Sequence, residues 1–522
     1  MLTPELCYRA LRTRDRRFDG RFFVAVRSTG IFCRPICPAR TPRRENCWFV
    51  PSAAAAREAG YRPCLRCRPE AAPGSPAWAG TSATVVRALR LIDAGALDEG
   101  DVEALASRLG VGARHLRRLF AQQLGASPRA VAQTRRLLLA KKLIDETALA
   151  LVDVATTAGF ASVRRFNDAV RRAYGCPPGD LRRRARTAAG RPDSDAVERG
   201  RSELTLRLAC RPPFAFDELL AFLAPRTTPR VECVQSGSYH RAVQIDGVPG
   251  HVSVRPAPDG DGLEARVGLA APASLGGLVG RLRRLFDLDA DPLAIAEQLA
   301  SDPVLAPALA AHPGRRVPGA WDGFELAVRA ILGQQVSVRG ATTLAGRLVE
   351  RFGLRCASGA EDLVDRVFPG PERLAHARVE SIGLPAARAA AIRALASAVA
   401  SQQIVLDGSA DPEATCAALE TLPGIGPWTT AYVAMRALGE PDAFPSGDLG
   451  LRRALAGPAG LPSPRALGER AEAWRPWRAY AALHLWQSET RAPVAALRSP
   501  ALRSRPWRSG CRAAPDDARN RG

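Results

Sequence analysis

The chain has 522 residues, which is too long for one hydrophobic core and predicts several domains of roughly 100 to 200 residues each. It carries 74 Lys and Arg against 52 Asp and Glu, a formal net charge of +22, which favours a polyanionic partner such as nucleic acid. No stretch approaches the roughly 20 apolar residues of a membrane span, and the N-terminus has no apolar signal-peptide core. We therefore expect a cytoplasmic protein with no membrane partner.

Breaks in composition divide the chain into segments. Two stretches without apolar periodicity, Pro69–Gly80 and Arg182–Gly200, are interpreted as linkers, and the basic residues 491–522 as a disordered tail. The segments between them are a Cys-bearing one at 1–72, a helical one at 82–181 and a long one at 202–490.

Four cysteines near the N-terminus form two close pairs, Cys33 with Cys37 and Cys64 with Cys67. In a reducing compartment, four thiolates at this spacing predict a tetrahedral Zn²⁺ site rather than disulfides. On spacing alone, a zinc knuckle that only stabilises a small fold is an open alternative. The sequence GIFCRPICPAR around the first pair, followed by GYRPCLRC at the second, closely resembles the zinc domain of the Ada family of methyl phosphotriester sensors.

The Ada resemblance implies that Cys33 accepts a methyl group from a DNA phosphotriester, while the other three cysteines are ligands only. Zinc keeps a thiol deprotonated and therefore nucleophilic. Methylation removes one negative charge from the site, which reduces repulsion from DNA phosphates. Candidate phosphate contacts, for which an ordinary solvated basic face is an equal alternative, are Arg34, Arg40, Arg43 and Arg44.

The helical segment contains a repeated helix-turn-helix pattern. Apolar residues at helical spacing over 102–120 surround a turn at Gly110, and the pattern recurs over 152–170 around Gly159. Two such units joined by a long helix at Pro128–Ile144 are similar to the AraC-type DNA-binding domain. A helical bundle with a basic solvent face is the alternative. The resemblance places the outward side chains of each second helix in the major groove of promoter DNA, namely Arg114, Arg117, Arg118, Arg164, Arg165 and Asn167.

The long segment begins with strand-like alternation and continues with helical patterns. The stretches Leu204–Leu208 and Ala242–Val254, the second interrupted at Gly247, predict a small antiparallel sheet. We expect this sheet to occupy residues 202–270 and a helical body to occupy 271–490. The fold class is therefore multidomain and mainly α: a small zinc-bound α/β domain, an AraC-type helical domain, and an α+β domain of antiparallel sheet and helices.

One run of the helical body, LPGIGPWT, places Gly424 and Gly426 in a tight hairpin whose backbone N–H groups would bind a DNA phosphate. A Gly-Ile-Gly turn alone also ends many ordinary helix pairs. Further along, Asp448 lies in the run FPSGDLGL. With the runs Ala327–Ser337 and Trp474–Trp486, these patterns resemble the AlkA branch of the helix-hairpin-helix glycosylase superfamily.

The AlkA resemblance implies a DNA-3-methyladenine glycosylase of type II, which hydrolyses the N-glycosidic bond of alkylated bases in double-stranded DNA. Asp448 would be the catalytic carboxylate, which either stabilises charge on the sugar or orients a water molecule. Trp428, Tyr432 and Trp486 would line the pocket for a flipped cationic base, with simple core packing as the alternative. Gln335 aligns with the residue that wedges into the DNA stack, although an apolar residue is common there.

Three further features refine this interpretation. Relatives that also cleave the DNA backbone carry a lysine where this chain has Trp428, so we expect a monofunctional enzyme. After Asp448 the only cysteine is Cys511, so we expect no iron–sulfur cluster. Asp442 precedes the aligned position and is interpreted as a solvated or helix-capping residue.

Together the resemblances imply an alkylation-repair glycosylase fused to a methyl phosphotriester sensor and transcription regulator. Its expected partners are alkylated DNA, promoter DNA and RNA polymerase. The alternative is mainly a transcriptional regulator with weak or no glycosylase activity. Asp448 favours the enzyme, and Cys33 favours the regulator.

Overall fold

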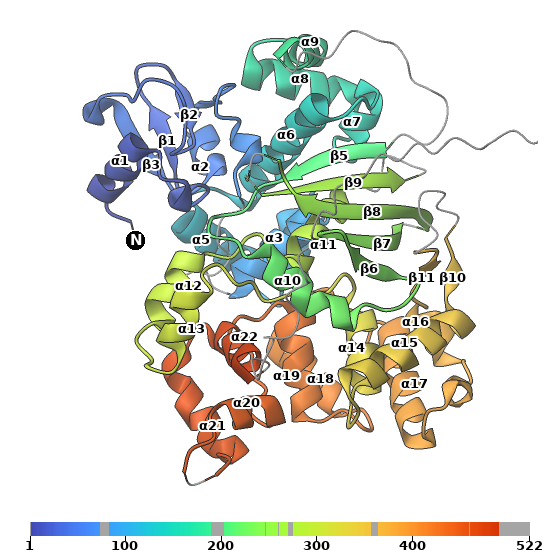
Figure 1. Ribbon diagram of the computed structural model, residues 1–522. Helices are drawn as coiled ribbons and strands as arrows, with labels where there is room; N and C mark the ends of the chain where they lie inside the picture. The colour runs from blue at the N-terminus through green and yellow to red at the C-terminus, as the bar shows by residue number, and fades with distance from the viewer. Residues whose placement is uncertain are drawn as a thin grey trace, which may run out of the picture.

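The computed structural model describes residues 2–73, 83–188, 203–245, 247–258, 260, 262–269, 275–356, 364–458 and 460–489. The predicted tail at 491–522 and parts of both predicted linkers lie outside these residues. We call the described parts the N-terminal segment (2–73), the helix-turn-helix segment (83–188) and the C-terminal segment (203–489). In Figure 1 the first two lie beside and above a central sheet, and most helices of the third lie below it. Within these ranges, none of the helices combines the length and apolar character needed to cross a membrane.

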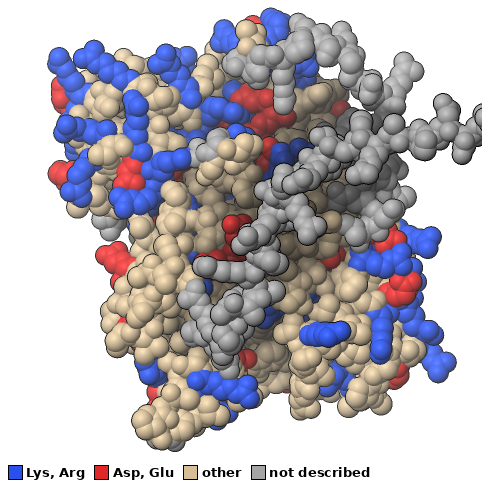
Figure 2. Space-filling model, viewed as in Figure 1, with Lys and Arg blue, Asp and Glu red and all other residues tan. Residues whose placement is uncertain are grey.

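The N-terminal segment forms a small sheet with two helices. Its strands follow the order β3 (Cys47–Val50), β1 (Phe23–Val26), β2 (Ile31–Cys33) and β4 (Arg62–Pro63). Thr3 and Ser52 accept backbone N–H groups at the starts of α1 (Pro4–Thr13) and α2 (Ala53–Glu58). Strand β2 pairs in parallel with β4, so the ends of these strands lie together. Lys and Arg side chains gather over this segment on the face shown in Figure 2.

The two predicted helix-turn-helix units are present, as α4 with α5 and α7 with α8. They are joined by α6 (Pro128–Glu146), which begins at the predicted Pro128 and continues past the predicted end at Ile144. Gly125 and Gly175 end α5 and α8 in the left-handed conformation, with φ of 64° and 72°. The other helices of this segment are α3 (Ala83–Asp93), α4 (Val102–Arg108), α5 (Ala113–Leu124), α7 (Leu151–Thr157), α8 (Val163–Tyr174) and α9 (Pro178–Ala188).

The C-terminal segment begins with a five-stranded antiparallel sheet in the order β5-β9-β8-β7-β6. The predicted strand at Leu204–Leu208 is β5 (Glu203–Leu208), and the predicted interruption at Gly247 is the turn between β7 and β8, where φ is 80°. Sequence patterning missed α10, β6 and β9 in this region. The remaining bounds are α10 (Phe216–Leu223), β6 (Glu232–Gln235), β7 (Ser238–Ile245), β8 (Val248–Pro256) and β9 (Leu263–Leu269).

The helical body has two cores. One is shared with the sheet and includes α22, and the other lies among α14, α15, α17 and α19. The hairpin between α18 and α19 therefore lies at the second core. The helices are α11 (Leu275–Leu285), α12 (Pro292–Leu299), α13 (Leu305–Ala311), α14 (Gly323–Leu332), α15 (Val338–Phe352), α16 (Pro371–Ala375), α17 (Ala386–Ala400), α18 (Pro412–Glu420), α19 (Pro427–Val433), α20 (Leu449–Ala454), α21 (Pro464–Ala471) and α22 (Arg478–Glu489).

A buried charge cluster, made of Glu232, Arg241, Glu325 and Arg329, joins the sheet to α14. Arg241 on β7 lies 3.2 Å from Glu232 on β6 and also pairs with Glu325 on α14. Arg329 pairs with Glu232 at 2.7 Å and with Glu325 at 3.2 Å. The Arg241 side chain is 3% exposed and the two glutamates 5%. Because a buried charge that loses its partner is strongly destabilising, the cluster holds α14 in one position against the sheet.

A second set of ion pairs joins all three segments at the edge strand β5. On α6, Lys142 and Glu146 lie 2.8 Å apart. Lys142 Nζ donates to the carbonyl oxygen of Arg207 on β5, and the Arg207 N–H donates to Glu146 at 3.2 Å. Arg68 of the N-terminal segment pairs with Glu146 at 3.2 Å. These contacts satisfy backbone groups on an open strand edge, so α6 covers that edge as a neighbouring strand would.

Helix α3 makes a separate contact with the C-terminal segment. Arg87 pairs with Asp411 at 3.2 Å, and Arg90 donates to the carbonyl oxygens of Gly408 (3.0 Å) and Leu438 (2.6 Å). The helix-turn-helix segment therefore contacts both the sheet and the helical body.

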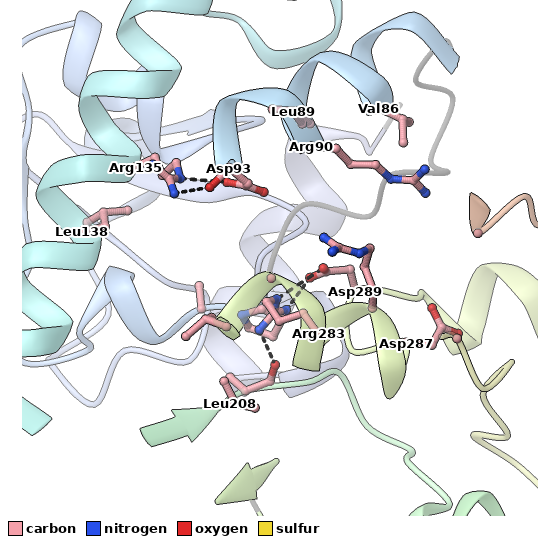
Figure 3. Close-up of a pocket in the computed structure, with 18 of the residues that line it drawn as sticks. Val86, Leu89, Arg90, Asp93, Arg135, Leu138, Leu208, Arg283, Asp287 and Asp289 are labelled. Carbon is pink, nitrogen blue, oxygen red and sulfur yellow. Dashed lines mark hydrogen bonds and ion pairs between the residues drawn. The ribbon is translucent and has the colours of Figure 1, made fainter. Parts of the chain in front are cut away.

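A cavity of about 460 Å³ lies where α3, α6 and α11 approach one another. Figure 3 shows charged side chains on its walls, with Arg135 directed toward Asp93 and Arg283 toward Asp289. Arg135 Nε lies 3.1 Å from Asp93, and Arg283 pairs with Asp289. Four of the charged side chains along this cavity are thus paired with one another.

We predict that Glu146→Ala lowers the free energy of unfolding by about 3 kcal/mol, because Lys142 and the Arg207 N–H lose a buried, charged acceptor. Glu99→Ala, at an exposed position of the same segment, should change it by less than about 0.5 kcal/mol. Chemical denaturation followed by circular dichroism measures both values. Equal unfolding curves for the two variants would contradict the prediction.

Candidate functional site

The four predicted metal ligands lie together in the N-terminal segment. The sulfur atoms of Cys33, Cys37, Cys64 and Cys67 all lie within 4.8 Å of one another. The parallel pairing of β2 with β4 produces this cluster, because Cys33 ends β2 and Cys64 follows β4. Four sulfur donors at this separation fit one tetrahedral Zn²⁺. Cys33 is partly exposed, whereas the other three cysteines are buried.

A cavity of about 720 Å³ lies beside the cysteine cluster. Cys33, Cys37 and Cys64 contribute to its wall, and the basic side chains around it are Arg40, Arg43, Arg62 and Arg66. Cys33, the most exposed cysteine of the cluster, therefore lines a space with cationic walls, which suits an anionic substrate.

Arg34 does not act as predicted. Its guanidinium pairs with Asp19 and donates to the carbonyl oxygen of Cys67 at 3.1 Å, and its side chain is only 11% exposed. Its backbone N–H donates to Cys67 Sγ at 3.3 Å. Arg34 thus stabilises the cysteine cluster through its hydrogen bonds to Cys67, and the expectation of a phosphate contact was wrong for this residue. The Arg43 side chain is 85% exposed and keeps that possibility.

The predicted recognition residues lie on the second helix of each helix-turn-helix unit. Arg114, Arg117 and Arg118 are exposed on α5, and Arg164 and Arg165 are exposed on α8. Asn167 on α8 is half-buried. Arg117 pairs with Glu103 of α4 at 2.5 Å, so part of its charge is compensated within the unit. The other four arginines present cationic groups to solvent at the helix faces expected to meet DNA.

Asp448 is the N-cap residue of α20, and its carboxylate receives three hydrogen bonds. The backbone N–H of Leu451 donates to Oδ1 at 3.0 Å, as is typical of a helix N-cap. The indole N–H of Trp486 donates to the same oxygen at 2.8 Å, and that of Trp428 donates to Oδ2 at 2.8 Å. Helix capping and two indoles from distant helices together fix the orientation of this carboxylate.

The three predicted pocket aromatics surround Asp448. Trp428 and Tyr432 on α19 stack with ring centroids 5.4 Å apart and planes 10° apart, and the Trp486 ring on α22 lies 6.4 Å from Tyr432. All three remain partly exposed, whereas the nearby Trp474 is only 1% exposed. Partial exposure beside a fixed carboxylate distinguishes this aromatic group from a packed core.

The predicted hairpin connects α18 with α19. Gly424 has φ of 76°, and a Cβ there would lie 3.2 Å from Ala391 Cβ, so glycine suits this turn. Gly426 caps α19. Gln334 Nε2 donates to the Gly424 carbonyl oxygen at 2.9 Å and so ties the end of α14 to the hairpin. Gln335 is exposed, with a φ of 56°, in the turn that follows α14.

Sequence reasoning missed two residues of this site and misjudged a third. Gln334 connects to the hairpin, whereas the sequence motif singled out only its neighbour Gln335. Arg436 Nη1 donates to the Tyr432 hydroxyl at 2.5 Å, and the four-residue spacing on one helix was a usable signal. Asp442 is not a solvated or capping residue, because it pairs with both Arg475 and Arg478.

Comparison with known proteins decides the family. A bifunctional transcriptional activator/DNA repair enzyme of the AlkA type from Mycobacterium tuberculosis is 45% identical over 483 residues, which cover 92% of this chain and 96% of that protein. The chain belongs to this family. Four domain models agree with it: the metal-binding domain of Ada at 6–70, a helix-turn-helix domain at 105–184, the AlkA N-terminal domain at 205–322 and the HhH-GPD superfamily base excision DNA repair protein at 328–479.

Two proteins of Escherichia coli K12 resemble parts of the chain. DNA-3-methyladenine glycosylase 2 is 33% identical over 53% of this chain and 95% of its own length. The bifunctional transcriptional activator/DNA repair enzyme Ada is 41% identical over 26% of this chain and 37% of its own length. The family thus joins a DNA repair glycosylase to an Ada-like transcriptional activator with a zinc-binding domain. The predicted fold class, zinc cofactor, DNA partner and enzyme class are confirmed.

We predict that the purified chain contains one zinc ion, held by Cys33, Cys37, Cys64 and Cys67. Cys64→Ala should lose most of it, since three sulfur ligands hold zinc less tightly than four. Cys47→Ala changes a buried thiol outside the cluster and should retain full zinc content. Metal analysis by mass spectrometry measures all three proteins, and full zinc content in Cys64→Ala would refute the ligand assignment.

Proposed function

We propose that the C-terminal segment removes alkylated bases from double-stranded DNA and that Asp448 is its catalytic carboxylate. The observation that carries this proposal is the carboxylate held by two indole N–H groups inside a partly exposed aromatic group. Positive charge develops on the deoxyribose as the glycosidic bond breaks, and a fixed anion stabilises that charge without reorganising. The water that completes hydrolysis approaches the same sugar carbon.

We infer that Trp428, Tyr432 and Trp486 bind the flipped base. Alkylation of a purine ring nitrogen leaves the base cationic, and a cation over aromatic faces gains roughly 0.5 to 2 kcal/mol. The same charge makes the base a better leaving group. This supports N-alkylated purines such as 3-methyladenine as substrates. Trp428 stands where backbone-cleaving relatives carry lysine, so the proposed reaction is simple hydrolysis.

Contacts with the DNA backbone are assigned to the hairpin. The N–H groups that follow Gly424 and Gly426 would bind a phosphate on the flank of the lesion. Gln335 is exposed in the neighbouring turn, where it would occupy the space left by the flipped base. The domain ranges proposed for these functions are 1–72, 82–181, 202–270 and 271–490.

We propose that the N-terminal segment repairs methyl phosphotriesters through Cys33. Its sulfur attacks the methyl carbon, an S–C bond forms, and the C–O bond breaks with its electron pair left on the phosphate oxygen. A bound zinc ion would keep the Cys33 sulfur in its thiolate form. The partial exposure of Cys33 and the arginines around the adjoining cavity support this assignment. The transfer is stoichiometric, because nothing removes the methyl group from sulfur.

The helix-turn-helix segment would then bind promoter DNA through the exposed residues of α5 and α8. Loss of one negative charge at Cys33 favours this binding, since it weakens repulsion from phosphates. Activation of transcription requires contact with RNA polymerase, which we propose as a further partner. These activities place the protein in the cytoplasm with the chromosome.

For the glycosylase, we predict that Asp448→Asn lowers the release of methylated purines by about a hundredfold or more. Asparagine keeps the helix cap through its carbonyl oxygen but removes the charge that stabilises the transition state, and its amide N–H₂ group cannot accept from one of the two indoles. Asp407→Asn, at an exposed carboxylate of the same helical body, should retain full activity. Single-turnover release from a defined duplex measures each rate. Unchanged rates in Asp448→Asn would exclude this carboxylate, and no release by the unmodified protein would favour a mainly regulatory protein.

For the sensor, incubation with DNA that contains methyl phosphotriesters should add one methyl group to Cys33 and tighten promoter binding about tenfold or more. Peptide mass mapping locates the methyl group, and fluorescence anisotropy measures the affinity. Cys33→Ser should abolish both effects, whereas Cys47→Ser should preserve them. A methyl group on Cys64 or Cys67 would contradict the assignment.

A further inference from the structure

Arg436 lies directly behind the aromatic group and is held by three acceptors. Helix α19 continues into a π-helical turn at Ala434–Leu438, an irregularity frequent at functional sites, and Arg436 lies in this turn. Its Nε donates to the carbonyl oxygen of Pro318 at 2.7 Å and its Nη2 to that of Gly319 at 3.2 Å. Its Nη1 donates to the Tyr432 hydroxyl oxygen at 2.5 Å. Arg436 is 5% exposed, so its position is fixed before DNA binds.

This contact dictates what the Tyr432 hydroxyl can do. A guanidinium has no acceptor atom and stays charged, so the tyrosine oxygen must accept in the hydrogen bond. The phenolic proton therefore points elsewhere, and within the ranges that the structure describes we find no side-chain or backbone acceptor for it. Tyr432 is partly exposed and stacks on Trp428 beside Asp448. Tyr432 therefore carries a hydrogen-bond donor that no residue in the described ranges accepts.

We propose that Arg436 is a positioning residue for base recognition: it occupies the Tyr432 oxygen and leaves the phenolic O–H to donate to a carbonyl oxygen of the flipped base. This inference rests on the proposed function, in which Tyr432 contacts that base. The substrates that gain this hydrogen bond are alkylated purines with a ring carbonyl, such as 7-methylguanine. A base with an amino group at the equivalent ring position, such as 3-methyladenine, gains less.

The surrounding charges strengthen this donor. Burial raises the pKa of Tyr432, but Arg436 and Arg226 outweigh burial and leave this pKa below its usual value. A more acidic phenol is a stronger hydrogen-bond donor. Arg226 acts by charge alone, because its Nη1 donates to the Phe222 carbonyl oxygen at 2.8 Å and its guanidinium lies over the Phe222 ring. Replacement of Arg226 therefore removes only a charge near Tyr432, whereas replacement of Arg436 removes both a charge and the hydrogen bond.

DNA treated with a methylating agent contains both 7-methylguanine and 3-methyladenine, so one incubation with the full-length protein compares them. We expect Tyr432→Phe to lower the release of 7-methylguanine relative to 3-methyladenine about fivefold, the scale of one lost hydrogen bond. Arg436→Met should lower this ratio by a similar factor. The double variant should lower it no further, because both substitutions remove one interaction. Arg436→Lys, which retains a charged donor, should restore part of the ratio.

Arg226→Met is the matched control, since it removes a nearby charge but leaves the hydrogen bond intact, and it should lower the ratio by much less than Arg436→Met. A spectrophotometric titration of tyrosine gives a second readout. Arg436→Met should raise the pKa of the group that Tyr432→Phe removes, which a purely structural role of Arg436 would not predict.

An unchanged ratio in Tyr432→Phe would overturn the inference. So would a ratio that falls in Tyr432→Phe but not in a folded Arg436→Met. If Arg436→Met does not fold, the double variant Arg436→Lys with Tyr432→Phe is compared with the two single variants. Effects on the ratio that do not add indicate that both residues act through one hydrogen bond, and additive effects would overturn the inference. Failure of the proposed function has a different signature: Asp448→Asn would then release both bases at the unmodified rate.

Discussion

The geometry of the catalytic region depends on the buried charge cluster beneath the sheet. Arg241 and its partners are withdrawn from water, so each charge must keep its counter-charge, and α14 can dock on the sheet in only one way. Helix α14 leads to Gln334, which holds the hairpin at Gly424. The hairpin begins α19, and α19 carries Trp428 to Asp448. The ion pairs of the cluster thus fix the helix that positions the hairpin, and the hairpin leads to the tryptophan that donates to the Asp448 carboxylate.

The residues that the sequence singled out lie in short motifs, and the roles expected of them came from the resemblance of these motifs to known families. The cysteine pairs and the run around Asp448 have patterns that few other chemistries require, and the structure brings their members together. Gln334 was missed because its role depends on a contact with another segment. The spacing of Arg436 from Tyr432 was a usable signal, but a four-residue spacing is common on helices and does not show which pairs are in contact. A polar residue in a helix has many possible partners, and only the folded chain selects among them.

The same distinction applies to the fold. Helices of the helix-turn-helix units were predictable because apolar residues recur with the helical period and glycines mark their ends. Strands β6 and β9 were missed, since short strands in a sheet draw their stability from pairing with neighbours that lie far along the chain. The packing of α3 and α6 on the C-terminal segment was also beyond sequence patterning. It combines ion pairs with apolar contacts, since Leu143 and Ile144 of α6 share a core with Leu206 of β5, and sequence patterning does not show which apolar faces pack together.

The covered edge of β5 joins two parts of the chain that resemble separate proteins elsewhere. In Escherichia coli, an Ada-like activator and a 3-methyladenine glycosylase are separate proteins, each similar to part of this chain. Here Lys142 and Glu146 of one part complete the backbone hydrogen bonding of Arg207 in the other. The helix-turn-helix segment and the glycosylase part are therefore in direct contact, and more than a linker joins them. Removal of α6 would expose the edge of β5, and an unpaired strand edge of this kind can associate with another chain.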